Sequence, residues 1–140
     1  MKILVTVDGS DISTRALKFA VKLAKQFEKP ATVALLHVDP PVFPGVERRI
    51  GREAVRSYHA DNHAHALGLA RKALVRSKVE VEEIAEVGEI AETILAVARK
   101  RKIDLIVMGS HGRGAVKGVL LGSVSAKVIA QTDIPVTIVR

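Results

Sequence analysis

Residues 104–125, DLIVMGSHGRGAVKGVLLGSVS, contain an apolar run, a glycine-rich loop and the start of a helix in direct succession. The run 104–108 is apolar on both faces, which is typical of a central strand in a parallel sheet. Five of the chain's ten glycines fall within residues 109–122. Glycine lets backbone N–H groups approach an anion, and a helix N-terminus attracts negative charge. The segment predicts a phosphate-binding loop, although glycines that only turn a flexible loop would leave the same pattern.

Strand and helix patterns alternate along the rest of the chain. Residues 2–8, 31–38, 79–82 and 136–139 are predicted to be strands, and the segments 51–77 and 123–132 and the residues after Gly88 are predicted to be helices. The helix after the first strand begins behind Ser10 and Asp11 and ends before Pro30. Its expected apolar stripe consists of Ile12, Ala16, Phe19, Ala20, Leu23 and Phe27. Prolines and a glycine predict a loop over residues 39–45.

This alternation implies right-handed crossovers and a parallel sheet with helices on both faces. The charged alternation of residues 79–82 predicts that the third strand lies at an edge. A strand order of 3-2-1-4-5 brings the strand ends at Asp8, Val38 and Gly109 to one crevice, whereas the order 2-1-3-4-5 separates strands one and four. We therefore expect a single-domain α/β protein over residues 1–140, with a doubly wound five-stranded parallel sheet of order 3-2-1-4-5.

The composition of the chain limits the binding partners and the cellular compartment that we expect. The chain has 22 Lys and Arg against 15 Asp and Glu, a formal charge of +7. These bases are scattered without aromatic neighbours, so we expect a solvated surface and no nucleic-acid partner. The apolar start of the chain is too short for a membrane span, which predicts no membrane association. Because there is no cysteine, a reducing compartment is expected, with the cytoplasm as the default.

Two common phosphate motifs do not fit the glycine-rich loop. Gly109 and Gly114 have the spacing of a Walker loop, but Ala115 and Val116 occupy its lysine and hydroxyl positions. Gly112, Gly114 and Gly118 approach a dinucleotide-binding pattern, yet no acidic residue closes a strand about 20 residues later. The loop therefore belongs to neither a P-loop enzyme nor a Rossmann dehydrogenase.

Gly109-x2-Gly112-x9-Gly122-Ser123 matches the Gly-x2-Gly-x9-Gly-Ser/Thr motif, and the chain here resembles the ATP-binding branch of the universal stress protein family. The resemblance extends to the segments Asp8-Gly9-Ser10, His37-Val38, 104–112 and 134–140. It implies that the ligand is ATP, with Mg²⁺ or Mn²⁺ as an optional ion on the phosphates, and that the protein forms a homodimer through its C-terminal strand. That strand also has no later element to cover its edge.

The resemblance also implies roles for particular residues. Asp8 and the backbone of Val38 would face the adenine, with Thr6 nearby, and Met108, Gly109 and Gly112 would line the ribose and phosphates. The phosphate tail would be bound by Gly122, Ser123, Val124 and Ser125. The loop sequence itself adds Ser110, His111, Arg113 and Lys117 as further candidates. Asp8 also has a purely structural interpretation as a helix cap, and His111 as a residue that faces water.

Three histidines, His59, His63 and His65, lie on the predicted helix 51–77. His59 and His63 are one turn apart, as in some metal sites, but no His-Glu-x-x-His signature is present. A solvated or dimer-facing cluster is the preferred interpretation, and no metal site is expected.

No catalytic residues can be assigned, since neither a Walker aspartate nor a pair of catalytic carboxylates is present. The leading hypothesis is an ATP-binding stress-response or signalling module whose bound state alters its contacts with an unknown protein partner. A weak or partner-assisted ATPase, supported by multiple turnover, and an interaction protein with a vestigial site, supported by a failure to bind adenine nucleotides, are the alternatives.

Overall fold

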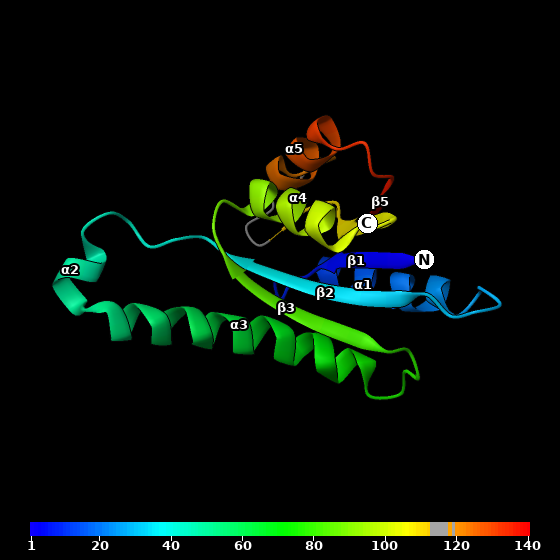
Figure 1. The fold of residues 1–140 in the computed structure, drawn as a ribbon, viewed down its shortest axis with the longest axis horizontal. Coiled ribbons are helices and arrows are strands. Elements are labelled where there is room, and N and C mark those ends of the chain that lie inside the picture. The colour runs from blue at the N-terminus through cyan, green and yellow to red at the C-terminus, as the bar shows by residue number, and fades with distance from the viewer. Residues whose placement is uncertain (113–117, 119) are drawn as a thin grey trace.

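The computed structural model describes residues 1–112, 118 and 120–140 of the chain. These residues form a five-stranded parallel sheet of order β3-β2-β1-β4-β5, which confirms the predicted topology (Figure 1). The strands are β1 (Lys2–Thr6), β2 (Thr32–Asp39), β3 (Val81–Val87), β4 (Leu105–Gly109) and β5 (Val136–Val139). The helices are α1 (Asp11–Ala24), α2 (Val46–Ile50), α3 (Arg52–Leu74), α4 (Ile90–Arg101) and α5 (Ser123–Gln131).

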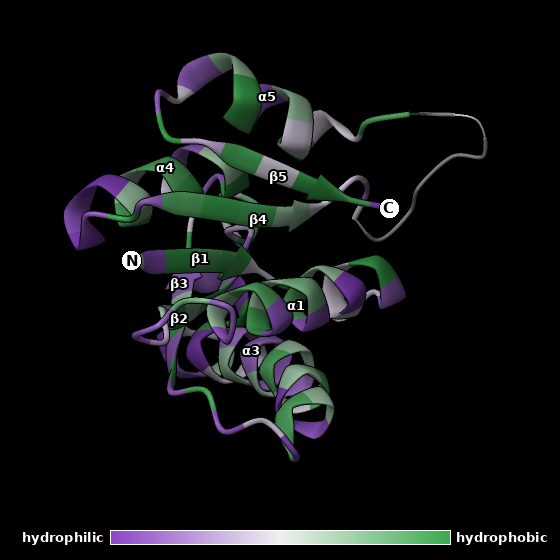
Figure 2. Ribbon diagram, turned by 90° about the vertical axis from the view of Figure 1, so that its right-hand side faces the viewer, coloured by the Kyte–Doolittle hydropathy of each residue, from purple (hydrophilic) through white to green (hydrophobic). Residues whose placement is uncertain are grey.

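The sheet has a hydrophobic core on each face. Ile3 and Val5 of β1 point toward α1 and α3, while Leu4 points toward α4 and α5, and all three are fully buried. Figures 1 and 2 show these two pairs of helices on opposite sides of the sheet, with hydrophobic strands between them. This alternation with burial on both faces is what the apolar strand sequences predict.

The two edges of the sheet differ in character. In β3 only Ile84 is buried, and Glu82, Glu83 and Glu86 are exposed, which confirms the expected acidic edge strand. This strand begins at Val81, two residues later than the alternation predicted, and continues to Val87. At the other edge, β5 pairs with β4 and is half-buried along its length.

The apolar stripe of α1 was predicted in the wrong register. Its buried residues are Ser13, Ala16, Leu17, Ala20, Val21 and Ala24. Phe19 and Phe27, both members of the predicted stripe, are 40% and 37% exposed. The helix ends at Ala24, before Pro30 is reached. The small alanines instead let α1 pack closely against the sheet.

A short helix, α2, forms between the predicted loop and the long helix α3. Gly45 and Gly51 lie at its two ends, and both have a left-handed φ of +89°. That conformation favours glycine and breaks helical continuity, so α2 and α3 are separate helices. The chain there projects away from the sheet (Figure 1).

The corrected register of α1 is testable by mutation. Leu17 is fully buried, whereas Phe19 is 40% exposed. We expect Leu17→Ala to lower the free energy of unfolding by about 3 kcal/mol, and Phe19→Ala, although it removes more atoms, by less than half as much. Urea denaturation of the two variants checks this, and an equal or larger cost for Phe19→Ala would contradict the packing described.

Candidate functional site

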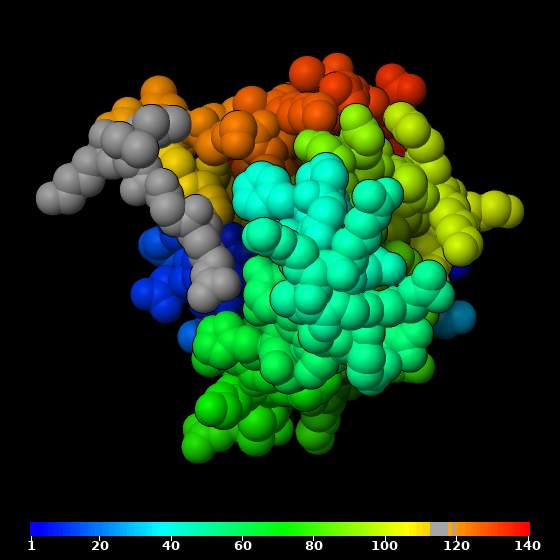
Figure 3. Space-filling model, turned by 90° about the vertical axis from the view of Figure 1, so that its left-hand side faces the viewer, coloured from blue at the N-terminus to red at the C-terminus, as the bar shows by residue number. Residues whose placement is uncertain are grey.

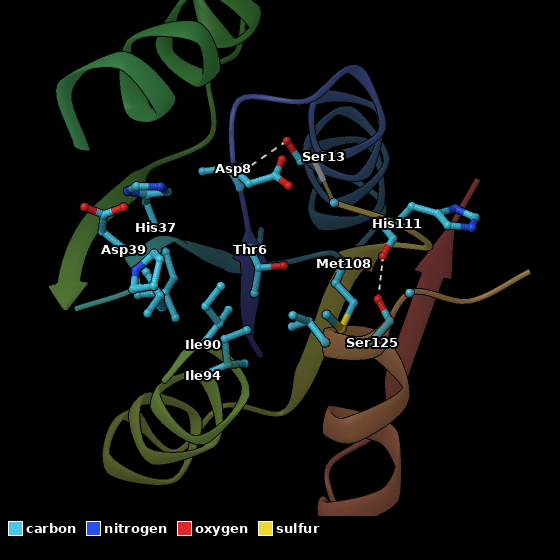
Figure 4. Close-up of a pocket in the computed structure, with 18 of the residues that line it drawn as sticks. Thr6, Asp8, Ser13, His37, Asp39, Ile90, Ile94, Met108, His111 and Ser125 are labelled. Atoms are coloured by element: carbon cyan, nitrogen blue, oxygen red, sulfur yellow. Dashed lines mark hydrogen bonds between the residues drawn. The ribbon is translucent and has the colours of Figure 1, made fainter. Parts of the chain in front are cut away.

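A cavity of about 440 Å³ opens at the carboxyl ends of β1, β2 and β4. Parallel α/β sheets place their ligand sites at this edge, beside the point where the strand order reverses. Figure 3 views the molecule from this side, where the segment after β2 stands between α3 and α5. The close-up in Figure 4 shows the interior, with Thr6 and Met108 near its middle and His37 and Ser125 at opposite ends.

The cavity brings together most of the predicted site residues. Those that line it are Thr6, Asp8, Val38, Met108, Gly109, His111, Gly112, Gly122, Ser123, Val124 and Ser125. Ser110 is 1% exposed and lies behind the cavity wall, where its N–H donates to Val139 O and its carbonyl accepts from the Gly122 N–H. Arg113 and Lys117 lie outside the described residues.

Glycine is required where the loop after β4 passes close to other elements. A Cβ on Gly109 would lie 2.5 Å from Cγ2 of Ile12 in α1. A Cβ on Gly112 would lie 2.9 Å from Oδ2 of Asp8, so the loop backbone passes close to this aspartate, which lies two residues after the end of β1. Glycine at these two positions lets the loop lie this close to its neighbours, and Asp8 forms part of the cavity wall.

The capping alternative for Asp8 is only partly correct. Ser10 is the N-cap of α1, and its Oγ accepts a hydrogen bond from the Ser13 N–H. Asp8 lies two residues before this N-cap, and its Oδ1 accepts a hydrogen bond from the Ser10 N–H at 2.9 Å. The carboxylate thus orients the capping turn through one oxygen and faces the glycine-rich loop with the other.

The N-terminus of α5 forms one end of the cavity. Gly122 is the N-cap, and the first backbone bond of the helix runs from the Ala126 N–H to Gly122 O. The N–H groups of residues 123–125 therefore have no acceptor within the helix, and no acidic residue lies in its first turn. The Ser125 hydroxyl donates to Gly109 O at 2.9 Å, so its proton is already engaged. This end offers backbone donors and the positive end of a helix dipole.

A polar network at the other end joins β2 to α3, and the sequence analysis did not find it. His59 Nδ1 donates to Asp39 Oδ2 at 2.6 Å, and Asn62 Nδ2 donates to the same oxygen at 2.9 Å. His37 and His63 contact each other through their Nδ1 atoms at 2.7 Å. The spacing of these residues in the sequence could have indicated the network, because residues 37 and 39 share a strand face and residues 59, 62 and 63 share a helix face.

The histidine cluster is therefore not solvated or dimer-facing as expected. His59 is 9% exposed and pairs with Asp39, and His63 is half-buried against His37, because helix α3 turns this face toward β2. Only His65 of the three is exposed. Within the described residues, no group of three or more His, Cys, Asp or Glu side chains is arranged to hold a metal ion.

Burial and hydrogen bonding shift two pKa values in this network. Burial alone would raise the pKa of Asp39, but hydrogen bonds from Asn62 and His59 and the charges of protonated His59 and His37 together lower it. Asp39 is therefore ionised at neutral pH. Burial lowers the pKa of His63, a nearby protonated His59 lowers it further, and the carboxylates of Asp39 and Glu86 act in the opposite direction.

The whole chain, residues 1–140, matches the model of the universal stress protein family. It is 37% identical to the universal stress protein YxiE of Bacillus subtilis, with 99% of this chain and 98% of that protein covered. It is 33% identical to MJ0531 of Methanocaldococcus jannaschii, with 99% and 81% covered. The chain belongs to the universal stress protein family.

Solved structures show the same fold. MJ0577 of M. jannaschii superimposes with a TM-score of 0.80 at 30% identity, covering 99% of this chain and 94% of that one. A universal stress protein in complex with cAMP has a TM-score of 0.70 at 26% identity, covering 100% and 97%. The Archaeoglobus fulgidus protein in complex with dAMP has a TM-score of 0.64 at 26% identity, covering 100% and 98%. Among the described residues, no helix is long and apolar enough to cross a membrane.

The lowered pKa of His63 predicts a pH dependence of stability. Its ordinary value of 6.5 applies in the unfolded chain, so below that pH the unfolded state binds more protons than the folded state. The contribution to stability is present above pH 6.5 and is lost as the pH falls through the folded pKa. We expect His63→Gln to flatten the decline in the free energy of unfolding below pH 6.5, as measured by urea denaturation at each pH.

The control is His65→Gln, which changes an exposed histidine two residues away on the same helix. It should leave the pH profile as in the wild type. A steep profile retained in His63→Gln would show that the pair with His37 does not govern acid stability.

Proposed function

We propose that the chain binds an adenine nucleotide in the strand-end cavity, with its phosphates at α5 and its base toward β2. The observation that carries this proposal is the N-terminus of α5, which presents backbone N–H groups of residues 123–125 to a cavity built beside Gly109 and Gly112. Such a helix end is suited to phosphate because the N–H groups and the helix dipole act together. Relatives of the same fold in complexes with cAMP and dAMP support an adenine nucleotide as the ligand.

The charges of the cavity favour this orientation over the reverse. Asp8 lies at the middle and Asp39 at the β2 end, and both would repel a phosphate. Val38, Ile90 and Ile94 supply an apolar surface at that same end, which suits the faces of a purine ring. In this orientation the base of the nucleotide contacts apolar and acceptor groups of the cavity, and the phosphates contact its donor groups.

The particular ligand that we propose is ATP, whose phosphate chain would begin at α5, while the candidate donors Arg113 and Lys117 lie outside the described residues. Mg²⁺ or Mn²⁺ would be held by the phosphate oxygens, since the first turn of α5 has no acidic residue. The bound state would act as a stress-response or signalling state in the cytoplasm, read by a protein partner. Mass spectrometry of the nucleotide released from freshly purified, denatured protein identifies the ligand, and release of no adenine nucleotide after incubation with ATP would contradict the proposal.

The α5 end is tested by Ser123→Asp. Residue 123 is exposed in the first turn of the helix, where an aspartate stabilises the helix but repels phosphate. ATP at about 100 times its dissociation constant stabilises wild-type protein by about 2.7 kcal/mol, which raises the melting temperature by several degrees. We expect Ser123→Asp to lose most of this shift, as measured by differential scanning calorimetry.

The matched control is Ser123→Asn, which has the same shape without the charge and should keep most of the shift. Adenosine, which has no phosphate, should bind the wild type and Ser123→Asp equally. If Ser123→Asp responds to ATP as the wild type does, the phosphates do not lie at α5.

We also propose a homodimer formed through β5. The Ile106 N–H donates to Pro135 O and the Ser110 N–H donates to Val139 O, so the odd-numbered residues of β5 face β4. The backbone groups of Val136 and Ile138 therefore point to the open edge of the sheet. An unpaired edge of this kind pairs readily with a second chain.

This geometry selects the variant that tests the dimer. Ile138→Pro removes an outward N–H without removing a bond to β4, so we expect the protein to become monomeric at micromolar concentration. Ile138→Ala removes a similar amount of side chain, keeps the N–H, and should remain dimeric. Sedimentation velocity distinguishes the two, and a wild-type protein that is already monomeric would contradict the dimer itself.

A further inference from the structure

The base end of the cavity has a polar wall that the proposed nucleotide would face. This wall is built by α3, whose Tyr58 and Asn62 are one turn apart on the same helix face and both line the cavity. Opposite them, Val38 and the isoleucines of α4 line the cavity with apolar groups. A flat aromatic ring placed here has apolar contacts for its faces and polar groups for its edge.

Asp39 fixes the orientation of the Asn62 amide. An ionised carboxylate only accepts hydrogen bonds, so the group that lies 2.9 Å from Asp39 Oδ2 must be the amide nitrogen of Asn62. His59 donates to the same oxygen and holds the carboxylate in place from the preceding turn. Asp39 takes one of the two N–H groups of this nitrogen and so fixes the plane of the amide, which leaves the carbonyl oxygen Oδ1 as the acceptor that Asn62 can offer to a ligand.

We infer that Asn62 is a specificity-determining residue for the base, with Oδ1 accepting a hydrogen bond from the exocyclic amino group of a 6-aminopurine. This inference rests on the proposed function, since it names the group that reads the base of the nucleotide. The contact is a property of the pair Asp39–Asn62, because without the carboxylate the amide could rotate and present its N–H groups instead.

An acceptor at this position separates purines by the chemistry of position 6. An amino group there donates to Oδ1, whereas an oxo group places two acceptors against each other and leaves both without a partner. A site that hydrogen-bonds a ligand group discriminates strongly against ligands that lack it, because its own polar atom is then left unsatisfied. Asp39 adds a second acceptor to the same wall, so the wall as a whole favours donors.

The test is a ligand and protein double-mutant cycle measured by isothermal titration calorimetry. The ligands are AMP and purine riboside 5′-monophosphate, which lacks only the 6-amino group, and the proteins are the wild type and Asn62→Ala. We expect the wild type to bind AMP about tenfold more tightly than the deaminated analogue, and Asn62→Ala to bind both with nearly equal affinity. The exposed Asp61→Ala, on the same helix, should behave as the wild type.

Each outcome decides between separate hypotheses. Wild-type protein that binds neither nucleotide contradicts the proposed function, whereas wild-type protein that binds both equally contradicts only the role of Asn62. A preference for AMP that survives in Asn62→Ala also overturns the inference and assigns the amino group to another acceptor, such as Asp8. Since the wild-type comparison needs no variant, the inference stays falsifiable if Asn62→Ala fails to fold.

Discussion

The central position of β1 is the constraint on which the cavity depends. β1 is hydrogen-bonded to β2 on one side and to β4 on the other. Because parallel connections are right-handed, the chain that moves from β1 toward β3 places α1 and α3 on one face, and the chain that moves from β4 toward β5 places α5 on the other. The connections that leave β1 and β4 therefore diverge to opposite faces, and a crevice opens between them at their carboxyl ends.

Close backbone contacts then convert this crevice into a defined cavity. Gly109 lets α1 approach the end of β4, and Gly112 lets the following loop pass close to Asp8. Ser110, between these glycines, is bonded through its backbone to Val139 in β5 and to Gly122 at the start of α5. The loop is thus held at the same point by three elements, which positions the N-terminus of α5 relative to the sheet.

Much of the fold could be predicted from the sequence because buried parallel strands leave long apolar runs. The order of the strands followed from the requirement that Asp8, Val38 and Gly109 meet. The packing face of α1 could not be predicted, because large apolar side chains such as Phe19 were counted as core residues, while the close approach of the helix selects alanines around Leu17. Short α2 was also missed, since five residues carry too little periodicity to indicate a helix.

The glycine-rich end of the site could be predicted because a cluster of glycines in one loop indicates a backbone that turns sharply or approaches a ligand closely. The α3 wall could not be predicted, because each of its polar residues is ordinary on a helix surface. Their role depends on contacts with residues of β2, which lie far from them in the sequence. Asp39 was assigned to a loop by its neighbouring prolines, although it is the last residue of β2 and 7% exposed. A strand residue of this kind is recognised only when its donors on the helix are known.

The contact between His37 and His63 makes the hydrogen-bonding character of the two rings interdependent. With Nδ1 facing Nδ1 at 2.7 Å, one nitrogen must carry the hydrogen and the other must accept it. In the neutral pair, the ring that donates has a bare Nε2, and its partner has a protonated Nε2. The two neutral arrangements interconvert when the hydrogen between the Nδ1 atoms passes from His37 to His63 and the Nε2 hydrogen passes in the opposite direction. This exchange changes Nε2 of His37 from a hydrogen-bond acceptor to a donor without moving a heavy atom. The amide of Asn62 has no such exchange, because the carboxylate of Asp39 holds it in one orientation.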